Sequence, residues 1–173
     1  MNEHLQKTIE VLKERFGGQD SEHRGLVTVL LPAEQITTAV TLLRDEFKFD
    51  FLSSLTAVDY WPETEPRFHV VYQLWSNPQK VRIMLRVPVN DDLPEVPSVE
   101  PVFPVANWHE REVFDMFGIR FQGNSDMRRI IMPHDWVGHP LRKDYPLGYE
   151  EPQFTFNFDK IQVRKHSGRY EEA

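Results

Sequence analysis

A stripe of apolar residues near the N-terminus predicts an amphipathic helix. Its members recur at intervals of four, three and four residues: Leu5, Ile9, Leu12 and Phe16. That spacing places them on one side of an α-helix. Gly17 and Gly18 follow, and glycine readily adopts the left-handed conformation that ends a helix. We therefore expect a first helix over about residues 3–16, with one side buried.

The same spacing returns after a short apolar run. Leu26 to Leu31 form that run, which is typical of a short buried strand. Pro32 comes next, and proline fits the first turn of a helix because it has no amide hydrogen to leave unpaired. The stripe of the expected second helix is Ile36, Val40, Leu43 and Phe47.

Three further segments have the composition and alternation of β-strands. They are Phe49–Val58, Phe68–Trp75 and Lys80–Val87. The last two are joined by Ser76–Gln79, which contains the turn-forming residues asparagine and proline. Helices and antiparallel strands in this order predict an α+β fold, a two-layer domain with a mixed or antiparallel sheet covered by helices.

The composition changes near residue 88. Nine of the thirteen prolines lie from Pro88 onward, and proline lacks an amide donor and fixes φ. We expect this half to be extended and irregular, with one more helix from just after Pro104 to Gly118. The predicted organisation is an α+β domain over residues 1–118, followed over residues 119–173 by an extended, proline-rich docking segment and C-terminal tail.

The expected third helix has two different sides. Ala106, Val113 and Phe117 form an apolar stripe, and the carboxylate of Glu110 falls among them. The other side collects Trp108, Arg111, Glu112 and Asp115. Because Arg111 and Asp115 lie one turn apart, we expect them to form an ion pair. The indole of Trp108 lies among carboxylates, and we expect a partner arginine beside it.

Four cations follow this helix within a proline-rich stretch: Arg128, Arg129, Arg142 and Lys143. Prolines stiffen the backbone, and an arginine presents a planar fork to a carboxylate. Two interpretations stay open, and both can hold for different residues. The cations either close onto Glu110, Glu112 and Asp115 as an internal clamp, or they contact another subunit.

The composition argues against several classes of protein. With 20 basic and 27 acidic side chains, the net charge of −7 opposes attraction to nucleic acid or anionic lipid. The chain has no cysteine, so it has no disulfide and lacks the thiolates that usually hold iron–sulfur clusters. No apolar stretch approaches the ~20 residues that span a bilayer, and Met1–Glu10 is polar. We expect a soluble protein of the cytoplasm.

Enzyme motifs are incomplete. His109-Glu110 would begin a zinc-protease His-Glu-x-x-His motif, but Val113 stands where the second histidine belongs. His134, Asp135 and His139 are better read as surface or turn residues than as metal ligands. Nearby arginines should keep the pKa values of the helix carboxylates low, which opposes acid–base catalysis. We therefore expect no catalytic, cofactor-binding or metal-binding residue.

Three blocks of sequence resemble the 30 kDa subunit family, the C subunit of proton-pumping NADH:quinone oxidoreductase, respiratory complex I. They are Glu110-Arg111-Glu112-x-x-Asp115-Met116-Phe117-Gly118, Asp126-Met127-Arg128-Arg129-Ile130 and Gly138 to Leu147. Leu55 to Tyr60 extends the resemblance more weakly upstream. The family commonly has Gly-His-Pro-Asp where this chain has Gly123 to Asp126.

The resemblance implies a cofactor-free subunit of the peripheral arm. FMN and iron–sulfur clusters would belong to partner subunits. The neighbours would be the D, B and I subunits, of which D forms the quinone site. The complex passes electrons from NADH to quinone, couples this to proton translocation, and lies peripherally on the cytoplasmic side of the plasma membrane. The alternative is the equivalent subunit of a membrane-bound hydrogenase or a ferredoxin- or F420-linked quinone reductase.

The residues expected to dock a partner or to shape this segment lie in the same blocks. They are Trp108, Glu110, Arg111, Glu112, Asp115, Phe117, Arg128, Arg129, Pro140, Arg142, Lys143, Asp144 and Tyr145. In the tail, Phe154, Phe156 and Phe158 alternate with polar residues, which is typical of a strand whose aromatic side needs cover. We expect this ladder, together with the arginines, to bury surface against the quinone-site subunit.

Overall fold

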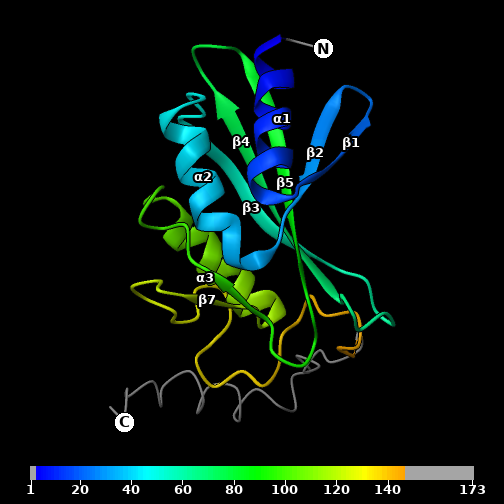
Figure 1. Ribbon diagram of the computed structural model, residues 1–173. Helices are drawn as coiled ribbons and strands as arrows, with labels where there is room; N and C mark the ends of the chain where they lie inside the picture. The colour runs from blue at the N-terminus through cyan, green and yellow to red at the C-terminus, as the bar shows by residue number, and fades with distance from the viewer. Residues whose placement is uncertain (1–2, 147–173) are drawn as a thin grey trace, which may run out of the picture.

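The computed structural model describes residues 3–146 of the chain. Three helices and seven strands follow one another along it (Figure 1). Their order is α1 (Glu3–Phe16), β1 (Gln19–His23), β2 (Leu26–Leu30), the 3-10 turn η1 (Ala33–Gln35), α2 (Ile36–Asp45), β3 (Phe51–Asp59), β4 (Phe68–Ser76), β5 (Val81–Val89), β6 (Glu95–Pro97), α3 (Ala106–Phe117) and β7 (Arg120–Gln122).

The main sheet has five strands in the order β1-β2-β5-β4-β3. Neighbouring strands are antiparallel except for β2 and β5, which run parallel. The sheet is therefore mixed, and the predicted α+β class is confirmed. A second, two-stranded sheet pairs β6 with β7 in parallel.

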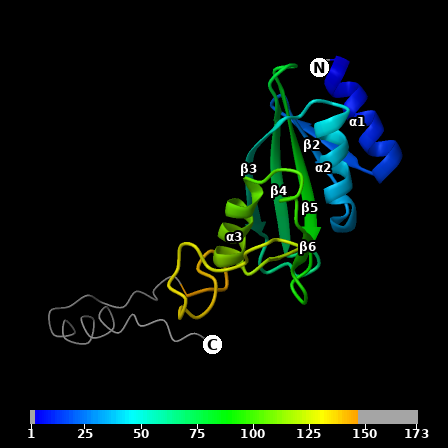
Figure 2. The ribbon, with the colours of Figure 1, turned by 90° about the vertical axis from the view of Figure 1, so that its left-hand side faces the viewer.

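Helices α1 and α2 lie on the same side of the sheet (Figure 2). Between them and the strands lies the core, in which the side chains of Leu12, Leu43 and Leu85 are fully buried. Burial of such side chains from water is the main favourable term in folding. Helix α3 packs along β3, the strand at one edge of the sheet. No helix within residues 3–146 is long and apolar enough to cross a membrane.

The differences from the predicted elements have local causes. Strand β1 was not predicted because all five of its residues are exposed, so it has no buried side to leave a pattern. Strands β6 and β7 have three residues each, too few for a period to be visible. Helix α3 ends where predicted, with Gly118 as its cap, and the φ of 78° at Gly118 is the left-handed conformation that ends many helices.

The tail prediction falls on residues that the structure does not describe. The segment Phe154–Phe158 and Leu147 both lie beyond residue 146. The aromatic ladder therefore stays a prediction. Below, "docking segment" means residues 119–146, the described part that follows α3.

Candidate docking surface

Helix α3 is covered on two sides, not one. Glu110 lies among the apolar residues as expected, and its side chain is fully buried. Asp115, on the other side of the helix, is also fully buried. The docking segment folds back over that side of the helix, and a helical wheel cannot show such a cover.

Asp115 organises the first part of the docking segment. Its Oδ2 accepts hydrogen bonds from the backbone amides of Ile130, Ile131 and Met132 at 3.1, 2.7 and 2.8 Å. Its Oδ1 receives Nη1 of Arg129 at 2.6 Å. The carboxylate therefore fixes a tight turn of backbone against the helix. The predicted pair between Arg111 and Asp115 is wrong, since Arg129 holds that position.

The Asp115 carboxylate stays ionised although it is buried. Burial raises the pKa of this carboxyl, but the amides of Met132 and Ile131 and the guanidinium of Arg129 outweigh it. The net effect is a pKa below the usual range. The carboxylate thus stays ionised at neutral pH, as predicted, although most of the hydrogen bonds that stabilise it come from backbone.

Two of the four cations act as an internal clamp. Besides Asp115, Arg129 binds the carbonyl oxygens of Trp136 and Gly138 at 3.1 and 3.0 Å. Arg142 donates from Nε to the carbonyl of Phe117 at 2.5 Å, in the last turn of α3. A cation at a helix C-terminus is favourable because unpaired carbonyls carry partial negative charge there.

Gly118 lets the docking segment come close to this helix end. A Cβ added at residue 118 would lie 2.6 Å from the ring of His139 and 2.8 Å from Arg142. Any other residue would push both side chains away. The amide of Leu141 also bonds to the carbonyl of Met116 at 3.0 Å.

A buried arginine that sequence analysis did not single out ties the end of the docking segment to the sheet. Only 1% of the Arg67 side chain is exposed. It binds Asp59 through both carboxylate oxygens at 3.1 Å, Asp91 at 3.0 Å and Asp144 at 2.5 Å. The backbone amide of Lys143 bonds to Asp59 at 2.8 Å. Arg67 thus joins β3 to the docking segment.

The charge of this cluster is maintained by its geometry. Burial raises the pKa of Asp59, but hydrogen bonds from Arg67, the Lys143 amide and the Trp61 amide bring it below its ordinary value. The hydrogen bond from Arg67 likewise lowers the pKa of Asp144. Asp59 belongs to the upstream block of the resemblance, so it could have been noticed. Arg67 belongs to no motif, and no sequence pattern indicated that it would be buried or would bind carboxylates.

Within the described part of the chain, Glu110 forms no ion pair. Its oxygens accept hydrogen bonds from Ser98 Oγ at 2.7 Å, the Val99 amide at 2.8 Å and Asn124 Nδ2 at 2.7 Å. Burial raises its pKa, and these hydrogen bonds offset the rise only in part. The expectation that arginines keep this pKa low is therefore wrong, because the arginines lie on the other side of α3.

Arg111 and Trp108 pair with each other. The guanidinium carbon lies 5.2 Å from the centre of the indole ring, a cation–π contact. Arg111 also donates to the carbonyl of Arg128 at 3.1 Å and lies 3.7 Å from the carboxylate of Asp126. The arginine expected beside Trp108 thus comes from its own helix, and it supports the docking segment.

The remaining motif residues divide into internal and exposed sets. Phe117 is buried, Pro140 is half-buried, and the hydroxyl of Tyr145 donates to the carbonyl of Val137 at 3.3 Å. Glu112 and Lys143 are exposed. The side chain of Arg128 is 82% exposed, and its guanidinium binds Asp126 at 2.7 Å.

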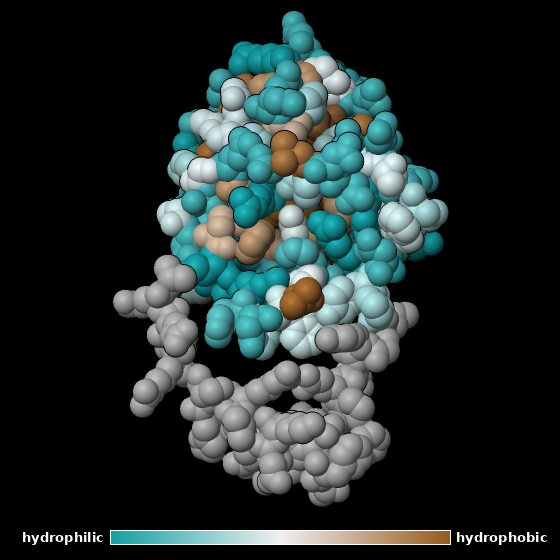
Figure 3. All heavy atoms as spheres, turned by 90° about the horizontal axis from the view of Figure 1, so that it is seen from below, coloured by the Kyte–Doolittle hydropathy of each residue, from teal (hydrophilic) through white to brown (hydrophobic). Residues whose placement is uncertain are grey.

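The exposed residues form what we call the docking surface, made by α3 and the docking segment. Its members are Trp108, Glu112, Arg128, Ile131, Val137, Leu141 and Lys143. Seen from below, the molecule is largely hydrophilic, with small apolar patches between polar groups (Figure 3). Aromatic and arginine side chains surrounded by polar groups are typical of protein–protein contacts.

The histidines of the docking segment do not form a metal site with other residues that the structure describes. Nδ1 of His139 bonds to the carbonyl of Asp115 at 3.0 Å, and its ring meets Phe114 edge-on. Within residues 3–146, no three His, Cys, Asp or Glu side chains come together in a way that could hold a metal ion.

Comparisons with known proteins point to one family. The sequence pattern of the family described as "Respiratory-chain NADH dehydrogenase, 30 Kd subunit" matches residues 29–151. A protein of Roseiflexus sp. (strain RS-1), named as the C subunit of NADH-quinone oxidoreductase, is 51% identical over 147 residues, which are 84% of each chain.

Two solved structures share the fold. One, titled Nqo5 of the trypsin-resistant fragment (1-134), has a TM-score of 0.65 and 32% identity, over 71% of this chain and 98% of that chain. The other belongs to the membrane-bound sulfane sulfur reductase, an archaeal respiratory membrane complex. It has a TM-score of 0.73 and 22% identity, over 99% of this chain and 95% of that chain.

Proposed function

Since the chain belongs to the 30 kDa subunit family of respiratory-chain NADH dehydrogenase, we propose that it is a cofactor-free scaffold subunit of an NADH:quinone oxidoreductase. It would sit in the peripheral arm, on the cytoplasmic side of the plasma membrane. There it supports electron transfer from NADH, through FMN and iron–sulfur centres in other subunits, to quinone. That transfer is coupled to proton translocation by the complex.

One observation carries the docking role. The docking segment is tied to α3 and β3 by the buried charges of Asp115 and Arg67, yet it leaves Arg128, Ile131 and Leu141 exposed. A surface whose backbone is already ordered loses less conformational entropy when a partner binds. This arrangement suits recognition, and we propose the quinone-site D subunit as its main partner, with the B and I subunits nearby.

The mechanism of such a subunit is indirect. The chain has no cysteine to ligate a cluster, and we assign no residue of it to the redox chemistry. By binding its neighbours in one orientation, it would keep their centres within electron-transfer distance and preserve the shape of the quinone pocket.

The equivalent subunit of a related hydrogenase or of a ferredoxin- or F420-linked quinone reductase is the second candidate. The fold is shared with a sulfane sulfur reductase complex at 22% identity, so the fold alone does not separate these machines. The 51% identity to the Roseiflexus NADH-quinone oxidoreductase protein favours the first candidate.

The test is an affinity pull-down of the tagged full chain from mildly solubilised membranes, read by mass spectrometry. We expect the D, B and I subunits together with flavin-bearing subunits. Recovery with hydrogenase subunits instead would support the second candidate. Recovery of the chain alone would contradict both.

A single charge reversal then tests the docking surface. Changing both Arg128 and Arg129 to Glu would mix two effects, because Arg129 holds the segment internally through Asp115. Arg128→Glu alone changes an exposed side chain, and we expect it to reduce recovery of the quinone-site subunit about tenfold. The matched control is Arg15→Glu on α1, a 56% exposed position that should leave recovery unchanged. Normal recovery with Arg128→Glu would remove this residue from the interface.

A further inference from the structure

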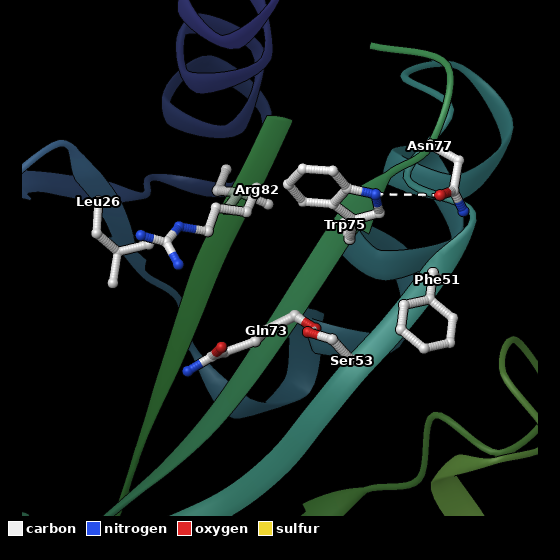
Figure 4. Close-up of a pocket in the computed structure, with 8 residues that line it drawn as sticks. Leu26, Phe51, Ser53, Gln73, Trp75, Asn77 and Arg82 are labelled. Atoms are coloured by element: carbon white, nitrogen blue, oxygen red, sulfur yellow. Dashed lines mark hydrogen bonds between the residues drawn. The ribbon is translucent and has the colours of Figure 1, made fainter. Parts of the chain in front are cut away.

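The sheet has an exposed hollow at the end near the β4–β5 turn, on the side away from α1 and α2. A row of four side chains crosses it, one from each of four neighbouring strands: Leu26, Arg82, Trp75 and Phe51. The hollow has a volume of about 550 Å³. Figure 4 shows the indole of Trp75 between Arg82 and Phe51. We call this row and its hollow the Trp75 face.

This face lies far from the docking surface. The β4–β5 turn is at the top of Figure 1, and the docking segment is at the bottom. The residues that line the hollow come from β2 to β5 and from the turn itself, and none comes from α3 or the docking segment. A partner on the docking surface would therefore leave the Trp75 face open.

The charge on this side of the sheet is unusual for the chain. Side chains alternate between the two sides of a strand, and the three strand carboxylates of the five-stranded sheet, Asp20, Glu22 and Asp59, all fall on the helix side. Arg82 and Arg86 fall on the open side. An acidic chain thus presents a sheet surface whose charged strand residues are arginines.

Arg82 is available to a partner. It is exposed, and within residues 3–146 its side chain forms no ion pair or hydrogen bond. Arg86, in contrast, already binds the hydroxyl of Tyr60 and stacks on its ring at 5.7 Å. The free positive charge on this face is therefore that of Arg82.

The apolar part of the face is equally available. Phe51 is 51% exposed although it lies in a strand. The indole N–H of Trp75 donates to Asn77 Oδ1 at 3.1 Å, so the polar group of this residue is satisfied and its ring can contact an apolar group. Tryptophan and arginine side by side are the residue types that contribute most to binding at protein interfaces.

We propose that the Trp75 face binds a segment of another subunit that presents an apolar side chain to the hollow and a carboxylate to Arg82. This proposal rests on the proposed function, since it gives the chain a second contact within the same complex. Self-association is opposed because two copies would bring arginines together, and the net charge of −7 opposes an anionic lipid surface.

The experiment uses the tagged full chain with benzoylphenylalanine in place of Phe51. The complex is assembled in the cell, isolated from membranes and irradiated. We expect an adduct with a different subunit, on a segment that contains aspartate or glutamate near the cross-linked residue. Adding Arg82→Glu should reduce the adduct about tenfold, whereas Arg82→Lys and the control Arg15→Glu should largely retain it.

Other outcomes overturn the proposal. An adduct with a second copy of the chain, an adduct with lipid, or no adduct would show that the face has another occupant or none. So would an adduct that Arg82→Glu does not reduce. Recovery of the partner subunits before irradiation tests the proposed function separately. An intact complex without the adduct would therefore refute this surface alone.

Discussion

The α+β domain and the docking segment are held in place by different physical interactions. The domain buries apolar side chains such as Leu43 and Leu85 between α1, α2 and the sheet. The docking segment is fixed mainly by buried carboxylates and guanidinium groups, at Asp115 and around Arg67. The hydrophobic effect has no direction, whereas hydrogen bonds between ions hold atoms in one geometry. The segment that we expect to recognise a partner is therefore the one with directional support.

This difference has an energetic consequence. Burying charges costs desolvation energy, so such clusters contribute little net stability while intact. Removing one member is costly, because its partners remain buried without compensation. The docking segment should thus be sensitive to single substitutions that change charge, and the domain to those that leave cavities.

Arg67→Met should give the largest effect. It leaves Asp59 buried without its guanidinium, and loss of one partner of a buried ion pair costs about 3–5 kcal/mol. We expect a lower free energy of unfolding in urea and faster amide hydrogen exchange at residues 139–146. Leu43→Ala is the comparison in the apolar core, at about 2–5 kcal/mol, with no preference for that segment. Unchanged exchange at residues 139–146 in Arg67→Met would contradict the anchoring role of Arg67.

Asp115→Asn should act more locally. It removes the charge that three amides and Arg129 share, and one hydrogen bond to a charged group contributes roughly 1.5–3 kcal/mol. Exchange at Ile130 to Met132 should accelerate while β4 and β5 stay protected. Glu112→Gln, at an exposed position of the same helix, is the control and should change neither region. Equal acceleration in β4 would mean that the two regions unfold together.

The pH dependence of stability should separate the two kinds of buried carboxylate, with the smallest effect. Asp59, Asp115 and Asp144 have lowered pKa values, so their contribution is complete above the unfolded value of about 3.9 and is lost as the pH falls further. Glu110 has a raised pKa, so its contribution is complete below about 4.3 and is lost as the pH rises through its folded value.

Glu110 should therefore lower the free energy of unfolding as the pH rises from about 5 to 7. His69 and His139 have lowered pKa values and act in the opposite direction over this range, so the test compares the unaltered chain with Glu110→Gln. Urea titrations at both pH values should show that the unaltered chain loses stability relative to Glu110→Gln by pH 7. Asp59 and Asp115 do not contribute in this range, since they are ionised in both states. An equal difference between the two chains at both pH values would contradict this role of Glu110.

Sequence analysis correctly predicted the helices and strands whose buried residues recur at a regular spacing. The stripes of α1 and α2 and the alternation in β5 each reflect one buried side, which leaves a regular pattern. Helix α3 was placed correctly, but the pattern could not decide between an internal clamp onto Asp115 and an exposed contact, because Asp115 is covered by residues that follow it by 14 to 17 positions. Charged residues buried by distant segments leave no periodic signal.

Arg67 shows most clearly which contacts a sequence pattern cannot predict. Its partners Asp59, Asp91 and Asp144 lie 8, 24 and 77 positions away, so no local rule connects them. The docking residues were found through the resemblance of three blocks to a known family. The division between internal clamp and exposed surface needed the structure: Arg129 and Arg142 turn inward, while Arg128 and Lys143 remain exposed.

The most direct test is hydrogen exchange of the full chain before it meets any partner, measured at neutral pH. If the docking segment is ordered by its own buried charges, the amides of Ile131 and Met132 should exchange about a hundredfold more slowly than unprotected amides. The amide of Lys143, which donates to Asp59, should exchange equally slowly. Exchange at unprotected rates in the free chain, with protection only after assembly, would show that partners create this surface.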